Sequence, residues 1–218
     1  HRDLHSFPTR RSSDLVDMRN RAFTESWHNE FQTAMAQHAG TKVERVDYES
    51  SDSVDFAAIV QKMLNRRPDG LLFVCGALDA ARLAQHARNQ APNMPISACE
   101  WAGTEQLLDL GGKVVEGLLI AQNFNREDDS PRYVAFREAF YRRFQTLPGY
   151  SSVMAYDAAT VLFTALRKKS AKETPKQAVL KYGPYQGLHQ AITFDANGDT
   201  ERMIFFAEIH NGQFRVLH

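Results

Sequence analysis

Glu100 and Trp101 are two adjacent residues whose side chains could bind a small charged ligand. Glu100 ends the run PISACE (95–100), which we expect to be a strand, and Trp101 follows at once. In an open parallel sheet, ligands bind beyond the carboxyl ends of the strands. A carboxylate beside an indole could there hold an ammonium group through charge-assisted hydrogen bonds and a cation–π contact. A structural interpretation stays equally open, in which Glu100 caps the next helical turn and Trp101 packs under it.

The motifs that mark common enzyme chemistry are missing from the sequence. No G-x-G-x-x-G follows an expected strand and there is no P-loop, so neither common nucleotide fingerprint is present. Gly149-Tyr150-Ser151 lacks the last glycine of a nucleophile elbow. The histidines beyond residue 15 are scattered, without a partner at triad or metal spacing. We therefore expect no catalytic residue, no metal site and no cofactor.

Two further motifs have ordinary structural interpretations. In DANGD (195–199), the oxygen ligands resemble a calcium loop, but Thr200 and Phe206 stand where that loop needs Gly and Glu. A hairpin turn at Asn197-Gly198 is therefore favoured. Cys75 and Cys99 end neighbouring expected strands, where a disulfide is geometrically awkward, so two buried thiols are favoured.

Apolar periodicity predicts the elements that would position these side chains. Up to residue 124, strands at 42–48, 70–76, 95–100 and 115–124 alternate with helices at 22–39, 51–67 and 77–91. This alternation predicts a doubly wound parallel α/β layer. Helices at 130–144, 151–169 and 174–183 follow, and the chain ends in strands around a hairpin turn at Asn211-Gly212.

Composition excludes several classes of protein. The chain has 218 residues, 43% hydrophobic and 24% charged, and its formal net charge is zero. These values are ordinary for a globular protein, and no basic surplus points to nucleic acid. No apolar run is long enough to span a membrane.

The first fifteen residues, HRDLHSFPTRRSSDL, differ from the rest in composition and carry no apolar period. Back-translated, they match an adapter oligonucleotide common in short-read sequencing libraries. We therefore expect residues 1–15 to be an artefactual adapter-derived peptide outside the fold. The rest would then be the C-terminal part of a longer protein whose signal peptide is lost, with most of the strand before Asp17 missing.

Four stretches together resemble the substrate-binding proteins of branched-chain amino acid type ABC transporters. They are DFAAIVQKMLNRRPDGLLFVCGALDAARLAQHAR, MPISACEWAGTEQLLDLGGKVVEGL, SPRYVAFREAFYRRFQTLPGYSSVMAYDAATVLFTAL and ITFDANGDTERMIFFAEIHNGQF. The resemblance covers residues 17–218. It implies the α/β type I periplasmic-binding-protein fold, with two Rossmann-like lobes that close over a ligand and a first lobe that is incomplete here. Residues 16–122 would form the second lobe, 123–190 the returning helices of the first, and 191–218 terminal strands that cross back.

The resemblance also implies which residues bind the ligand. Glu100 matches the acidic position that receives the α-ammonium group, and Phe23 matches an aromatic residue that lines the cleft. The remaining candidates are Ala77 and Leu78 at a second cleft-lining turn, Trp101 as an aromatic wall, and Ser151 and Ser152 where the first lobe approaches the ligand side chain.

The function that follows from the resemblance is a periplasmic or other extracytoplasmic solute receptor. It would bind a small ligand such as an amino acid or amide, deliver it to an ABC permease of the inner membrane, and catalyse no reaction. One alternative is a ligand-sensing domain of the same fold in a signalling or regulatory protein. A less favoured alternative is a Rossmann-like enzyme whose catalytic groups lie in the missing half.

A truncated first lobe would leave helices without the sheet that they cover. Apolar side chains at Phe136, Phe140, Phe144, Leu162 and Phe163 would then in part face water. Each large apolar side chain contributes roughly 1.5–3 kcal/mol when buried, a large fraction of a domain's stability. We therefore expect this chain alone to aggregate or to be partly unfolded, and to bind no ligand with useful affinity.

Overall fold

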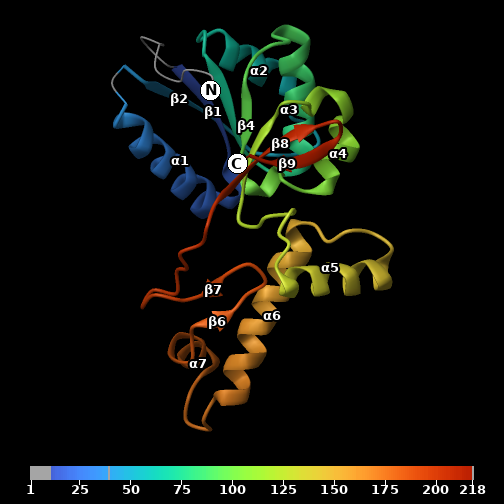
Figure 1. Ribbon diagram of the computed structural model, residues 1–218. Coiled ribbons are helices and arrows are strands. Elements are labelled where there is room, and N and C mark those ends of the chain that lie inside the picture. The colour runs from blue at the N-terminus through green and yellow to red at the C-terminus, as the bar shows by residue number, and fades with distance from the viewer. Residues whose placement is uncertain (1–10, 39, 218) are drawn as a thin grey trace. The chain divides into compact units, whose positions relative to one another are not determined.

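The computed structural model describes residues 11–38 and 40–217, which form two compact units (Figure 1). Unit 1 runs to Ala121 and also contains Phe206–Arg215, whereas unit 2 contains Gln122–Phe205 and the residues from Val216 onwards. Within these described ranges, no helix is long and apolar enough to cross a membrane.

Unit 1 is built on a seven-stranded sheet with the order β2-β1-β3-β4-β5-β8-β9. The first five strands in this order are mutually parallel, which confirms the predicted doubly wound layer. The strands are β1 (Arg11–Asp17), β2 (Lys42–Tyr48), β3 (Gly70–Val74), β4 (Ile96–Ala98), β5 (Leu119–Gln122), β8 (Phe205–His210) and β9 (Gln213–Val216).

Helices cover both faces of this sheet (Figure 1). The helices of unit 1 are α1 (Arg21–Ala36), α2 (Phe56–Leu64), α3 (Ala77–Gln90) and α4 (Glu105–Gly111), with short 3-10 turns η1 (Met18–Asn20), η2 (Glu100–Ala102) and η3 (Gly112–Val115). Side chains of α1 pack against Leu72, Val74 and Cys99 on one face. Side chains of α2, α3 and α4 join the main core, which includes Leu15 and Phe73 of the sheet.

The strand before Asp17 corrects the sequence-based expectation. Instead of being mostly missing, β1 runs over Arg11–Asp17, paired in register with β2 and β3, so residues 11–15 do take part in the fold. Ladder hydrogen bonds come from the backbone and are available to any non-proline sequence, and Leu15 and Val16 supply apolar side chains that are fully buried. The adapter origin of residues 1–15 stays a prediction, and residues 1–10 lie outside the described part of the chain.

The hairpin at Asn211-Gly212 is confirmed. Asn211 and Gly212 both have positive φ, at 52° and 68°, as a two-residue type I′ turn requires. The carboxylate of Glu116 accepts hydrogen bonds from both backbone N–H groups, at 2.9 and 2.6 Å. This acid therefore fixes the tip of the β8–β9 hairpin to the segment that leads into β5.

Unit 2 is mainly helical, with α5 (Pro131–Phe144), α6 (Tyr150–Lys168) and α7 (Pro175–Lys181), and with a short two-stranded sheet of β6 (Tyr185–Gln186) and β7 (Ala191–Ile192). Ser130 caps α5, because its hydroxyl accepts from the Tyr133 N–H. Thr174 and Gln177 form a full capping box at α7.

Several large apolar side chains of α5 and α6 face water, as expected. Phe144, Leu162 and Phe163 are 58%, 43% and 62% exposed, while Phe136 and Phe140 are half-buried. Tyr156, Phe163 and Leu166 also line an open hollow along α6 of about 690 Å³.

Candidate ligand-binding site at the carboxyl edge of the sheet

The carboxyl ends of β3 and β4 place most of the predicted binding residues. The chain leaves β3 through Cys75 and Gly76 into the first turn of α3, which carries Ala77 and Leu78. It leaves β4 through Cys99 into η2, which carries Glu100 and Trp101. Because the two strands are parallel and adjacent, both turns lie at the same edge of the sheet, where ligands bind in folds of this class.

The carboxylate of Glu100 is held by an indole that sequence reasoning missed. Trp27 Nε1 donates a 2.9 Å hydrogen bond to Glu100 Oε2, which joins α1 to η2 across 73 residues. Neither η2 nor α4 has a side-chain cap, so the interpretation of Glu100 as a cap is wrong. Trp27 follows Phe23 by four residues on α1, and this spacing, which puts both rings on one helix face, was the available signal.

Phe23 and Trp101 lie against each other in a parallel stack. Their ring centroids are 3.8 Å apart and their planes differ by 6°. Both rings are half-buried and pack against the cluster of Leu72, Val74 and Cys99. The structure thus brings Phe23, Glu100 and Trp101 together, as predicted, although Trp101 packs on Phe23 rather than under its own turn.

Ala77 and Leu78 differ in their exposure. The Ala77 side chain is 5% exposed and belongs to the main core, whereas Leu78 is 39% exposed. Of the two, Leu78 is the residue that a ligand at this edge could contact.

Ser151 and Ser152 belong to unit 2, in the first turn of α6. Ser151 is exposed and Ser152 is half-buried. Gly149 precedes this helix as its N-cap, and no side chain caps it. The participation of the two serines in binding stays a prediction.

Hydrogen bonds between buried polar groups stabilise the carboxyl edge of the sheet in unit 1. Tyr48 donates a 2.8 Å hydrogen bond to Asp79 Oδ2 in the first turn of α3, and burial raises the pKa of the Tyr48 hydroxyl. Asp17, at the end of β1, accepts from the backbone N–H groups of Arg19 and Ser50. These contacts fix the ends of β1 and β2 to the neighbouring turns.

Cys75 and Cys99 are free and buried, as predicted. Cys75 joins the main core and Cys99 the cluster beneath α1, so their side chains lie on opposite faces of the sheet. Burial raises the pKa of the Cys99 thiol to about 12 and that of the Cys75 thiol well above its usual value.

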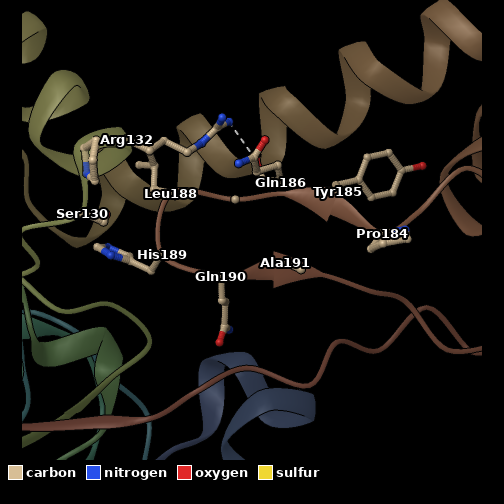
Figure 2. Close-up of a pocket in the computed structure, with 11 residues that line it drawn as sticks. Ser130, Arg132, Pro184, Tyr185, Gln186, Leu188, His189, Gln190 and Ala191 are labelled. Carbon is tan, nitrogen blue, oxygen red and sulfur yellow. Dashed lines mark hydrogen bonds between the residues drawn. The ribbon is translucent and has the colours of Figure 1, made fainter.

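A second hollow lies within unit 2, lined by residues 130–132 and 184–191 and about 600 Å³ in volume. Figure 2 shows the Arg132 guanidinium at the Gln186 carbonyl, to which it donates a 2.8 Å hydrogen bond. The His189 imidazole extends from the turn between β6 and β7 (Figure 2), and its Nδ1 lies 2.5 Å from Asp128 Oδ2. None of the predicted binding residues lines this hollow.

The described residues contain no group of three or more His, Cys, Asp and Glu side chains that could hold a metal ion. In the DANGD stretch, Asp195 Oδ1 accepts from the backbone N–H groups of Asn197, Gly198 and Asp199. The predicted turn is therefore present as a closed loop around Asp195, but its flanks are irregular rather than paired strands.

Three of the solved structures that this chain resembles are binding proteins. The leucine binding protein LivK of Thermotoga maritima matches with 24% identity and a TM-score of 0.87, covering 96% of this chain and 60% of that one. The substrate binding protein LivJ of Streptococcus pneumoniae, in complex with isoleucine, matches with 18% identity and a TM-score of 0.80, covering 95% and 60%. A solute binding protein of an R. palustris ABC transporter, in complex with benzoate, matches with 15% identity and a TM-score of 0.80, covering 96% and 58%.

This chain therefore spans about 60% of the length of these structures. Comparison with curated proteins gave no match. A family model described as periplasmic binding protein matches residues 17–213, which is most of the sequence. Together with the doubly wound sheet, this match shows that the chain belongs to the periplasmic binding protein family.

Proposed function

We propose that this chain is part of an extracytoplasmic solute receptor that binds an amino acid and delivers it to an ABC permease. The family is one of solute-binding receptors rather than enzymes. Solved structures of the same fold include a leucine binding protein and a branched-chain amino acid transporter substrate binding protein. The periplasm, or the outer face of the membrane, is the compartment that this role requires.

The proposal rests mainly on the surroundings of the Glu100 side chain. Its carboxylate lies beyond the end of β4, half-buried, beside a stacked pair of aromatic rings. Within residues 11–38 and 40–217, its side chain forms no ion pair and accepts only the Trp27 N–H. A half-buried carboxylate without a cation favours a positively charged ligand, and the α-ammonium group of an amino acid supplies one.

The remaining predicted residues extend this site. The Phe23–Trp101 stack and Leu78 would form its apolar walls, with Ala77 beneath them. Ser151 and Ser152, in the first turn of α6, would contact the ligand side chain. We infer that residues 16–122 form one lobe, that residues 123–190 belong to the other, and that residues 191–218 return to the first.

The exposed face of α5 and α6 supports the view that the functional receptor is larger than this chain. Contiguous exposed apolar surface on a protein marks an interaction site. The matched structures are longer by about 40% of their own length. We infer that the additional part includes a sheet that packs on Phe144, Leu162 and Phe163.

A thermal-shift screen of the complete receptor against amino acids, amides and carboxylic acids tests the proposal. Amino acids should raise the melting temperature, because a ligand that binds only the folded state stabilises it. Glu100→Gln should abolish these shifts and leave any shift from carboxylic acids unchanged. Glu105→Gln, an exposed acid at the start of α4, is the matched control. Shifts of equal size in the wild-type and Glu100→Gln proteins would contradict the role of Glu100.

A further inference from the structure

Trp27 contacts the central acid of the site without having been assigned a role. We propose that Trp27 is a positioning residue for Glu100: its indole N–H holds one carboxylate oxygen, so that the second oxygen is presented to the ammonium group of a ligand. This inference rests on the proposed function and adds to it the residue that orients the acid.

The indole of Trp27 is itself held in place by the sheet. It packs against Leu72, Val74 and Cys99, which are at most 3% exposed. Its ring also lies near that of Phe31, with centroids 6.3 Å apart. An indole N–H points in the plane of the ring, so a ring fixed by packing gives the donor a fixed direction toward Glu100 Oε2.

The backbone of Glu100 is fixed by the same helix. Phe23, one turn before Trp27 on α1, stacks on Trp101, the residue next to Glu100. The carbonyl of Glu100 accepts from the Gly103 N–H at 3.0 Å, which closes the turn of η2. One face of α1 therefore fixes both the side chain and the backbone of the acid.

The choice of an indole rather than a cation as the partner has a chemical consequence. An Arg or Lys partner would neutralise the carboxylate, whereas a neutral N–H donor orients it and leaves its full negative charge. The cations on and beside α1 are paired elsewhere, because Arg21 and Arg45 both bind Glu25. Among the described residues, no group donates to Glu100 Oε1, so this oxygen is available to a ligand cation.

Trp27 and Trp101 are the two tryptophans of this chain, and each gives one indole N–H signal in an NMR spectrum of the complete ¹⁵N-labelled receptor. Trp27→Phe and Trp101→Phe each remove one signal and so assign it. Glu100→Gln should shift the Trp27 signal upfield, and by more than it shifts the Trp101 signal, because the charged acceptor is lost. A Trp27 signal that does not move in Glu100→Gln would overturn the proposal.

Binding to the complete receptor supplies the second readout, with L-leucine and its deaminated counterpart 4-methylpentanoate as probes. Trp27→Phe keeps an aromatic ring but removes the donor, and should weaken L-leucine binding at least about tenfold in calorimetry, the effect of one hydrogen bond to a charged group. Phe31→Leu loosens the same packing but keeps the Trp27 N–H donor. Its Kd for L-leucine should stay within about twofold of the wild-type value. Equal losses in the two variants would mean that Trp27 acts only through packing, against the proposal.

The two proposals fail in different ways. If the wild-type receptor binds L-leucine no better than 4-methylpentanoate, ammonium recognition is refuted, and with it the proposed amino acid ligand. If it prefers L-leucine but Trp27→Phe binds as tightly as wild type, only the positioning role is refuted.

Discussion

Asp14 is a buried acid in the middle of the sheet of unit 1. Its side chain is fully buried, and its Oδ1 accepts a 2.6 Å hydrogen bond from the Ser12 hydroxyl. Oδ2 lies 3.3 Å from His28 Nδ1, but neither atom has a hydrogen-bond partner of good geometry among the described residues. Burial raises the pKa of Asp14 from 3.8 to about 6, against the opposing effects of Ser12 and His28.

This raised pKa makes stability depend on pH in a defined direction. The folded state binds the proton more tightly than the unfolded state, so the stability of unit 1 should fall as pH rises from about 4 to about 6. The loss is on the order of 3 kcal/mol above that range, at about 1.4 kcal/mol per pKa unit. Asp14→Asn should remove this dependence and raise the thermal midpoint at neutral pH. Asp52→Asn, at an exposed loop position, is the control and should change neither the pH dependence of stability nor the thermal midpoint. If Asp14→Asn keeps the pH profile of the wild type, Asp14 is not the group responsible.

The thiols of Cys75 and Cys99 should be unreactive in the folded chain. Both are 0% exposed, and their raised pKa keeps them protonated, while the thiolate is the reactive form. We expect no labelling by a disulfide reagent at pH 8 in native buffer, and two equivalents in concentrated guanidinium chloride. Labelling in native buffer at the denatured rate would show that this edge of the sheet opens readily.

Among the elements, the β8–β9 hairpin depends on one acid outside it. Glu116→Ala removes the acceptor for the Asn211 and Gly212 N–H groups and should lower the free energy of unfolding by about 1–2 kcal/mol. Denaturant unfolding measures the loss. Glu49→Ala, at an exposed acid beyond β2, is the control and should lower the free energy of unfolding much less. A loss no larger than that of the control would mean that water replaces the carboxylate without cost.

Elements with a strong apolar period were predictable from the sequence, whereas β1 was not. The expected strand at 42–48 matches β2 residue for residue, and α1 and α3 begin within one residue of their expected starts. In β1, by contrast, Ser13 and Asp14 are buried polar residues that break the pattern typical of a buried strand. Backbone hydrogen bonds to β2 and β3 hold β1 in the sheet, and the pattern of its side chains does not reveal these bonds.

The candidate site was predictable only in part. Glu100 and Trp101 could be found because they lie at the end of an apolar strand, and Phe23 came from the family resemblance. The hydrogen bond from Trp27 to Glu100 joins residues far apart in the sequence, and no local period encodes such a contact. Trp27 lies half-buried on α1, and the direction of its N–H became known only from the fold.

For the molecule as a whole, the exposed apolar face of α5 and α6 predicts self-association of this chain. Replacing Leu162 and Phe163 together by Ser should shift the chain from aggregate toward monomer, because both side chains face water and contribute little to the core. Size-exclusion chromatography with light scattering measures the change. Val161→Ser, at a neighbouring position that is 6% exposed, should destabilise unit 2 and increase aggregation. A wild-type chain that is already monomeric and melts cooperatively would contradict this expectation.

The route of the chain through unit 1 also bears on how it folds during synthesis. The sheet takes five strands from residues before 123 and its last two from residues 205–216. Since β8 is the neighbour of β5, the ribosome must make all of α5, α6 and α7 before β5 gains its second partner. Until then β5 is an open edge that could pair with another nascent chain. Premature termination near residue 200 should therefore do more harm to unit 1, which is made first, than to unit 2, which it interrupts.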